Sequence, residues 1–460
     1  MAAGILVLAL AAAGRAAAAW PAGGQPRRVH PPARLILAGT KRSTRRQAAA
    51  LIAAATPVRT TLGRMSRVAG AAEAAARELA GSGDFSRVSW DETTGLWDRQ
   101  PDQGDAAGMW QPPMWWQSAL AVTGLVDYLT AAKDTQPAYQ RVLADVYSSN
   151  VSRPGSLEPR LFENKYMDDT AWWGLAWADA ARYELTVAHD SAAASRYAQA
   201  AETIASYIHD QPHLCRSGGI DFERRHTPNT LTNAQFIALT AELARLRDTP
   251  GPLRDARKGR VWLADADSSL SWLQSSGLVN MTQGTVRYGY DSSCHPYGAA
   301  QTNSEGEMAE ALVALGQAAH RPQLVKAAAV FLDRVMSPGL GMLAGGVLQE
   351  PCESRRGACS GDSYNITVFK GVLDQAVRDW SEATGSAAFE WFLAAQARAV
   401  IAHAASNGEK ATRCQTPRSC VLGMYWARRI SPARQPKLPN AGSQAAGLEA
   451  LTSALVFKAR

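Results

Sequence analysis

Two adjacent carboxylates, Asp168 and Asp169, are the residues of this sequence best suited to carry a reaction. They lie between Tyr166 and the consecutive Trp172 and Trp173. Like charges this close push their pKa values apart, so that one carboxyl is ionised while the other is protonated, as glycoside hydrolysis requires. Adjacent Cα atoms are ~3.8 Å apart, so short Asp side chains reach the ~5–5.5 Å of retaining enzymes easily. The ~6.5–9.5 Å of inverting enzymes requires them to splay, so the spacing favours retention.

The same stretch also has a structural interpretation as the start of a helix. Asp169 or Thr170 would cap a helix over 170–186, and Asp168 would be stabilised by the helix dipole. The pair taken alone favours this interpretation. Its neighbours count against it, because one acid suffices for a cap and two consecutive Trp residues are hard to bury together.

Helical periodicity dominates the elements that must position these residues. Apolar residues recur at i, i+3, i+4 and i+7, and few alternating runs occur. The predicted helices cover 46–80, 114–133, 137–149, 170–186, 191–209, 230–247, 257–275, 303–319, 322–336, 366–385, 387–406 and 443–457. No fixed-period repeat supports a solenoid, so we expect an all-α closed ring of helical hairpins. Long loops at 82–113, 276–302 and 337–365 are expected on one face, where a site is usually built.

The basic charge of the chain is concentrated at its beginning. Residues 1–72 contain ten Arg, one Lys and no Asp or Glu, which gives +11. The whole chain carries +7, so the remainder carries −4. A mildly acidic body argues against nucleic acid as a partner, although the overall charge is basic.

The first residues have the pattern of a cleaved leader. An apolar run followed by small residues predicts a secretory signal peptide over 1–19, and an organelle transit peptide is the alternative. Residues 20–69 form a basic segment rich in Pro, Gly and Arg, and 70–460 are expected to form the catalytic domain. No apolar stretch reaches the ~20 residues of a membrane span, and the end of the chain lacks a lipid-anchor tail. We therefore expect no stable membrane insertion.

Six cysteines fit an oxidising compartment. Cys352 and Cys359 form one close pair and Cys414 and Cys420 another, which leaves Cys215 with Cys294; other connectivities remain open. A metal site is the alternative, but neither a C-x-x-C motif nor a His at ligand spacing supports it. Three glycosylation sequons, at Asn150, Asn280 and Asn365, also favour secretion.

Ordered sequence blocks give the carboxylate pair a family context. Tyr166 to Trp177 resembles the catalytic signature of glycoside hydrolase family 76, the endo-α-1,6-mannanases. Further blocks that resemble the family are 94–97, 115–119, Cys215-Arg-Ser-Gly-Gly, Leu231-Thr-Asn-Ala, Thr302-Asn-Ser-Glu-Gly, Glu350 with Cys352, Cys359 and Asp362, and Phe369-Lys-Gly. The resemblance covers roughly residues 85–457, and the Asp-Asp-Trp-Trp and Phe-Lys-Gly blocks are its most specific parts.

The resemblance implies an (α/α)6 barrel and a retaining mechanism without metal or cofactor. Asp168 would be the nucleophile and Asp169 the general acid/base. The implied substrate is α-1,6-mannan or a mannose-containing polysaccharide. Substrate contacts would come from Tyr166, Trp172, Trp173, Asn303, Asp362 and Lys370, and the last two could instead form a structural ion pair.

Two departures from the family pattern affect specificity more than reaction type. Ile220-Asp221-Phe222 replaces the Trp after the Gly block, and Glu305 occupies a place where the family usually has Gln. Three alternative functions therefore stay open: a transglycosidase that attaches mannose-containing glycans to wall polysaccharide, an unsaturated-uronide hydrolase, and a non-catalytic glycan-binding or wall-structural protein.

Overall fold

A computed structural model describes most of the chain after residue 61. The described residues are 62–81, 90–91, 95–97, 115–151, 162–211, 214–215, 218–223, 226–299, 301–353, 365–403, 414, 420–427 and 440–459. The predicted signal peptide 1–19 lies outside them, as do residues 20–61 of the predicted leader. Helix α2 begins at Leu62, so the last residues of that leader are helical.

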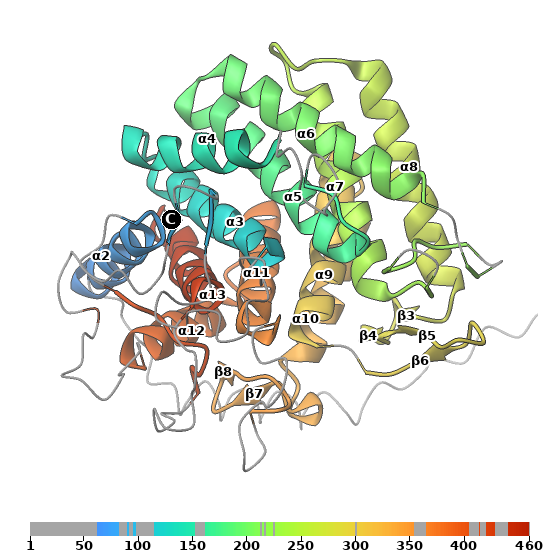
Figure 1. Cartoon of the computed structure of the whole chain (residues 1–460). Coiled ribbons are helices and arrows are strands. Elements are labelled where there is room, and N and C mark those ends of the chain that lie inside the picture. The colour runs from blue at the N-terminus through green and yellow to red at the C-terminus, as the bar shows by residue number, and fades with distance from the viewer. Residues whose placement is uncertain are drawn as a thin grey trace, which may run out of the picture. The chain divides into compact units, whose positions relative to one another are not determined.

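Six helices form a closed inner ring (Figure 1). They are α3 (Trp115–Ala132), α5 (Met167–Tyr183), α7 (Thr230–Asp248), α9 (Thr302–Ala318), α11 (Phe369–Thr384) and α13 (Ala441–Ser453). Each packs against the next, and α13 packs back against α3. This closure is the predicted ring of hairpins, an (α/α)6 barrel.

Six outer helices alternate with the inner ones along the chain. They are α2 (Leu62–Leu79), α4 (Pro137–Val151), α6 (Ser191–His209), α8 (Ala256–Ser275), α10 (Pro322–Val335) and α12 (Glu390–Ala402). Helices α6, α8 and α10 pack on α5, α7 and α9, whereas α2 and α12 pack on α13. Short helical extensions cover Glu184–Ala188, Pro338–Leu340, Asn365–Thr367 and Ala454–Ala459.

Inner helices have neighbours on all sides, and their sequences reflect this. Nearly every residue of α7 from Thr230 to Leu246 is buried, as expected for a helix that is not exposed on any face. Close contacts between inner helices depend on glycine. A Cβ at Gly371 would lie 2.7 Å from the Cα of Ala446, and one at Gly306 would lie 2.9 Å from the Cα of Leu373.

All six inner helices begin at the same end of the barrel, because an antiparallel outer helix returns the chain between them. The long loops at this end contain four two-stranded hairpins. Their strands pair as β1 (Trp90–Asp91) with β2 (Leu96–Trp97), β3 (Val279–Asn280) with β4 (Thr285–Val286), β5 (Gly289–Tyr290) with β6 (Pro296–Tyr297), and β7 (Leu343–Ala344) with β8 (Val347–Leu348). Hairpins β3 to β8 lie along the lower edge of the view in Figure 1. Among the described residues, no helix is long and apolar enough to cross a membrane.

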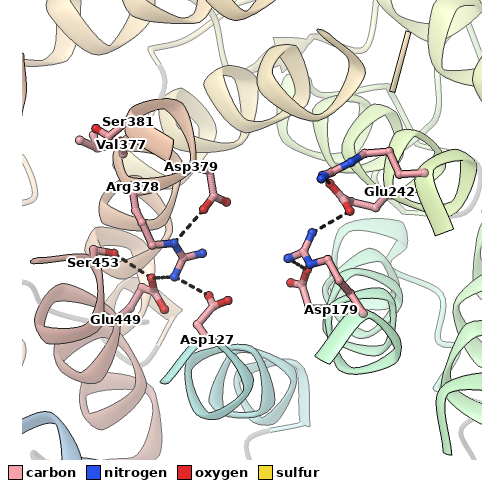
Figure 2. A network of polar contacts seen from close by, with 11 residues as sticks. Asp127, Asp179, Glu242, Val377, Arg378, Asp379, Ser381, Glu449 and Ser453 are labelled. Carbon is pink, nitrogen blue, oxygen red and sulfur yellow. Dashed lines mark hydrogen bonds and ion pairs between the residues drawn. The ribbon is translucent and has the colours of Figure 1, made fainter. Parts of the chain in front are cut away.

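Charged side chains meet inside the ring, mostly on the C-terminal halves of the inner helices (Figure 2). Arg378 pairs with Glu449 at 2.7 Å, with Asp127 at 3.0 Å and with its neighbour Asp379 at 2.7 Å. Arg182 pairs with Asp179 at 2.7 Å and with Glu242 at 2.8 Å. We call these residues, together with Glu307 and Glu310 of α9, the axial network.

The disulfides follow the predicted pairing where they are described. Cys215 is bonded to Cys294, and Cys414 to Cys420. Cys352 is also disulfide-bonded, and its predicted partner Cys359 lies outside the described residues. The first bond connects the loop after α6 to the β5–β6 turn, two segments 79 residues apart.

Candidate active site

Asp168 and Asp169 lie in the first turn of α5, at the barrel end that carries the hairpins. The helix begins at Met167 after the N-cap residue Tyr166, whose side chain makes no capping hydrogen bond. The prediction that Asp169 or Thr170 caps the helix is therefore wrong. Both carboxylates are within the helix, one residue apart, and both side chains are half-buried.

Asn164 organises the approach to this turn. Its Nδ2 donates to Oδ2 of Asp169 at 3.2 Å, and its Oδ1 accepts from the backbone N of Tyr166 at 2.7 Å. Its own N–H donates to Oγ1 of Thr170 at 3.0 Å, and its carbonyl accepts from the hydroxyl of Tyr207 at 3.0 Å. Sequence reasoning missed this role, although Asn bonding to a backbone N–H two residues later is a known turn signal.

The loop before α7 supports the same turn from the other side. The backbone N of Met167 donates to the carbonyl of Phe222 at 2.7 Å. Asn233 of α7 fixes that loop, because it accepts from the N–H of Ile220 and donates to its carbonyl, both at 2.9 Å. Asn233 also donates to the carbonyl of Asn229 at 2.7 Å. A buried amide thus helps to fix where the first turn of α5 begins.

Burial, and to a smaller extent the nearby charge of Glu223, raise the pKa of Asp168 to about 6. Hydrogen bonds from backbone N–H groups oppose this shift; one comes from Asp169 N to Oδ1 of Asp168 at 3.0 Å. The backbone carbonyl of Asp168 accepts from Nε2 of Gln235 on α7 at 3.4 Å. Helix α7 thus holds the backbone of this turn, while the carboxylate of Asp168 stays partly open to solvent.

Trp173 is a core residue, which contradicts its predicted contact with substrate. Its side chain is 0% exposed and packs 4.6 Å from the ring of Phe162 and 6.0 Å from that of Trp177, centroid to centroid. A sugar has no surface there to stack on. Trp172 follows Asp168 by one helical turn and is 3% exposed, so little of its ring is open to a ligand.

Lys370 is also buried, which contradicts its predicted contact with a sugar. Its side chain is 0% exposed, and its Nζ pairs with Glu353 and donates to the carbonyl of Met424. The ammonium also lies 5.2 Å from the ring centre of Trp426. Lys370 therefore joins two loops to the start of α11. Asp362, the other predicted partner, lies outside the described residues.

The first turn of α9 carries the remaining predicted contact. Asn303 is buried and its Oδ1 accepts from the N–H of Ser304 at 2.8 Å. It precedes Glu307 by one turn, so both lie on the same face of the helix.

Tyr166, the other predicted contact among the described residues, is half-buried, and the ammonium of Lys165 lies 4.6 Å from its ring centre.

Glu305, which stands where the family usually has Gln, lies two residues after Asn303 and is buried. Burial raises its pKa to about 8, against an opposing effect from Arg334. Among the described residues its Oε2 has no hydrogen-bond partner. Because this carboxyl is protonated at neutral pH, it is uncharged like the amide that it replaces.

Asp221 belongs to the other departure from the family pattern, Ile220-Asp221-Phe222, and its side chain has a structural role. It is 1% exposed, and its Oδ2 accepts from the N–H of Leu214 at 2.9 Å. This contact holds the segment beside the Cys215–Cys294 disulfide. Within the described ranges, no group of three or more His, Cys, Asp or Glu side chains is placed to hold a metal ion.

Comparison with known proteins gives this geometry a family. The model of glycosyl hydrolase family 76 matches residues 84–460. The chain belongs to this family. Its fold is therefore that of a family 76 glycoside hydrolase, while no curated protein matches the chain.

Solved structures of the family share the fold at low identity. The α-1,6-mannanase GH76A of Salegentibacter sp. HEL1_6 is 18% identical with a TM-score of 0.60, over 84% of this chain and 98% of that one. An inactive variant of that enzyme, with two consecutive aspartates changed to asparagine, is in complex with α-1,6-mannotriose. Dfg5 from Chaetomium thermophilum, in complex with glucosamine, is 18% identical with a TM-score of 0.66, over 87% and 92%.

Proposed function

We propose that this protein is a secreted, retaining glycoside hydrolase that cleaves α-1,6-mannosidic linkages in mannan or mannoprotein glycans. The observation that carries the proposal is the placement of Asp168 and Asp169 in one helical turn, at the barrel end where the loops gather. The mannanase relative supports the substrate, since its inactive double variant changes two consecutive aspartates and is in complex with an α-1,6-linked mannose trimer.

The reaction proceeds in two steps. The carboxylate of Asp168 attacks the anomeric carbon while Asp169 donates its proton to the departing glycosidic oxygen, which forms a glycosyl-enzyme ester. Asp169 then takes a proton from water, and the resulting attack on the anomeric carbon releases Asp168 as a carboxylate.

Linear α-1,6-mannan is the substrate for the decisive assay. Asp169→Asn is expected to lower kcat about 10²–10⁴-fold, the usual contribution of a general acid, and Asp168→Asn to lower it at least as much. Anomer-resolved product analysis should show retention by the wild type. Activity that survives both substitutions would rule out this site.

Azide separates the roles of the two carboxylates. With Asp168→Ala, azide should replace the nucleophile and give a mannosyl azide of inverted configuration. With Asp169→Ala, azide should attack the glycosyl-enzyme and give the retained azide, provided that the substrate has a good leaving group. If Asp168→Ala gave the retained azide and Asp169→Ala the inverted one, Asp168 would be the general acid/base and Asp169 the nucleophile. The raised pKa of Asp168 is a reason to test this reversed assignment.

A second candidate is a transglycosidase that transfers the mannosyl unit to a sugar hydroxyl instead of water. The similarity to Dfg5, whose structure contains glucosamine, favours an amino sugar as the acceptor. Product analysis with and without a glucosamine-containing acceptor distinguishes the two functions. Free reducing ends alone, in the presence of acceptor, would exclude transfer.

Secretion is supported by the described disulfides, since such bonds persist in oxidising compartments. The N-terminus of protein recovered from the medium tests the leader. A start at or close to Trp20 is expected for cleavage after the predicted 1–19 signal peptide. An intact Met1 on recovered protein would contradict it.

A further inference from the structure

Two tyrosines on the β5–β6 hairpin stand beside the catalytic turn. Tyr288 comes immediately before β5, and Tyr297 ends β6. Their ring centres are 5.8 Å apart with an interplanar angle of 69°. They are 37% and 44% exposed, which makes them two of only five large apolar side chains exposed among the described residues.

Backbone contacts hold this hairpin firmly on the start of α7. The N–H of Thr230 donates to the carbonyl of Tyr288 at 3.0 Å, and the N–H of Tyr290 donates to the carbonyl of Pro228 at 3.0 Å. The hydroxyl of Thr230 donates to the carbonyl of Arg287 at 2.7 Å. The aromatic pair therefore sits on a fixed frame and not on a free loop.

A disulfide fixes the turn of the hairpin, and a close glycine contact fixes its open end. Cys294, in the turn, is bonded to Cys215 in the loop after α6. Gly298 has a φ of +76°, and a Cβ there would lie 2.8 Å from the Cβ of Tyr288. Glycine thus lets the chain pass directly against Tyr288, so that the two rings keep their relative positions.

Tyr288 is also close to the nucleophile. Burial raises the pKa of its phenol, and the charge of Asp168 raises it further. Asn229, the N-cap of α7, hydrogen-bonds to the same phenol. Since α7 also holds the backbone of Asp168 through Gln235, one helix start positions both the carboxylate and the aromatic pair.

We propose that Tyr288 and Tyr297 form a sugar-binding subsite that holds a hexopyranose unit beyond the two units joined by the bond that is cleaved. The subsite rests on the proposed function for its substrate. The C–H face of a pyranose is apolar and covers a tyrosine ring, while its hydroxyls stay in water. Rigid, exposed aromatic rings bind such a face with little loss of conformational entropy, because few rotatable bonds must be fixed.

The test compares oligosaccharides of different length. Tyr297→Ala should lower kcat/KM for α-1,6-mannohexaose about tenfold, which corresponds to about 1.4 kcal/mol, chiefly through KM. The value for the shortest oligosaccharide that the wild type cleaves should change little, because that substrate need not reach the subsite. Tyr297→Trp should restore the activity. Trp391→Ala, on α12, is the matched control, since it removes another exposed aromatic side chain, 41% exposed.

Equal losses for short and long oligosaccharides, or no loss for either, would overturn the subsite. If the wild type cleaves no α-mannan, the proposed function fails separately from the subsite. The subsite is then tested by calorimetry of Asp168→Asn with α-1,6-mannohexaose and chitohexaose, with and without Tyr297→Ala. Binding of either probe that Tyr297→Ala weakens supports the subsite, and binding that it leaves unchanged, or no binding, rejects it.

Discussion

Competing effects act on the carboxylate of Asp168. Its place in the first turn of α5 and the backbone N–H groups bonded to it favour the anion. Burial and the charge of Glu223 favour the protonated form, and burial is the largest effect, so the pKa rises to about 6. A carboxyl with this pKa is mostly ionised at pH 7, as the proposed role of nucleophile requires.

This pKa predicts the acidic limb of the activity profile. A nucleophile must be ionised, so kcat/KM should fall about tenfold per pH unit below pH 6, since the profile follows the free enzyme. Glu223→Gln removes the neighbouring charge and should move that limb toward lower pH. Measurement of kcat/KM on mannan from pH 4 to 8 checks both. If pH 6 marked the alkaline limb instead, Asp168 would be the general acid.

A protonated carboxyl explains how Glu305 fits where the family has an amide. Its pKa of about 8 keeps it uncharged at neutral pH, although it ionises more readily than Gln as the pH rises. An ionised Glu in place of Gln would add a charge near the site. Burial removes that charge.

At the scale of elements, the catalytic turn depends on side chains of other segments. Asn233 on α7 binds the Ile220 backbone, and Phe222 two residues later binds the start of α5. Lys370 on α11 similarly joins the loop at Glu353 to the segment at Met424. These contacts explain why polar residues of the sequence blocks are buried and do not face a substrate.

Loss of the Asn233 amide should affect both stability and activity. Asn233→Ala leaves the buried N–H and carbonyl of Ile220 without partners, so unfolding in urea should become easier by about 1–3 kcal/mol. Since the loop supports Met167, kcat on mannan should also fall, at a temperature where the variant is folded. Ser195→Ala, on the exposed face of α6, is the control. Full kcat in a destabilised Asn233→Ala variant would show that the loop does not position the turn.

The two described disulfides offer an internal comparison of loop length. The chain-entropy model gives about 4.5 kcal/mol for the Cys215–Cys294 bond and about 2.2 kcal/mol for Cys414–Cys420, from separations of 79 and 6 residues. Replacement of both cysteines of one bond by Ser should therefore lower the free energy of unfolding in guanidinium more for Cys215–Cys294 than for Cys414–Cys420. A larger loss from the short loop would mean that native contacts, not chain entropy, dominate.

At the scale of the whole molecule, the axial network places more acids than bases inside the ring. Its carboxylates come from five inner helices besides α11, which supplies Arg378 and Asp379. Figure 2 shows these carboxylates except those of α9. Burial raises the pKa of Asp179 to about 7 and that of Glu307 to about 8, and raises those of Glu310 and Glu449 strongly. The folded barrel therefore holds protons that the unfolded chain releases.

This proton uptake predicts how stability varies with pH. Between the unfolded pKa of Glu, about 4.3, and the folded value of about 8, the native state binds more protons, so stability falls as pH rises. Glu307→Gln cannot take up this proton, so its stability should fall less as the pH rises. The free energy of unfolding of the variant minus that of the wild type should be about 1–3 kcal/mol larger at pH 8 than at pH 5. The charged groups that act on Glu307 are Asp179 of α5 and Glu310 of its own helix. Thermal unfolding from pH 5 to 8 tests this, with exposed Glu390→Gln as control. Parallel curves for both variants and wild type would contradict it.

Local patterns in the sequence determined much of this protein. The 3.6-residue periodicity predicted the helices to within a few residues at most boundaries, because it requires only that one stripe of each be buried. Cysteine spacing predicted the two described disulfides. The adjacent aspartates and the ordered blocks predicted the family, since those features do not depend on distant contacts.

Tertiary structure alone decided which side chains face the interior, the core or the solvent. Trp172 and Trp173 are both buried because α5 has neighbours on every side, which no pattern within 166–177 reveals. Lys370 is a structural cation because residues 17 and 54 positions away meet it. The helix begins at Met167 because Phe222 accepts its N–H. Such contacts exist only after the ring has closed, so neither the axial network nor the position of Tyr288 near Asp168 could be predicted from the sequence.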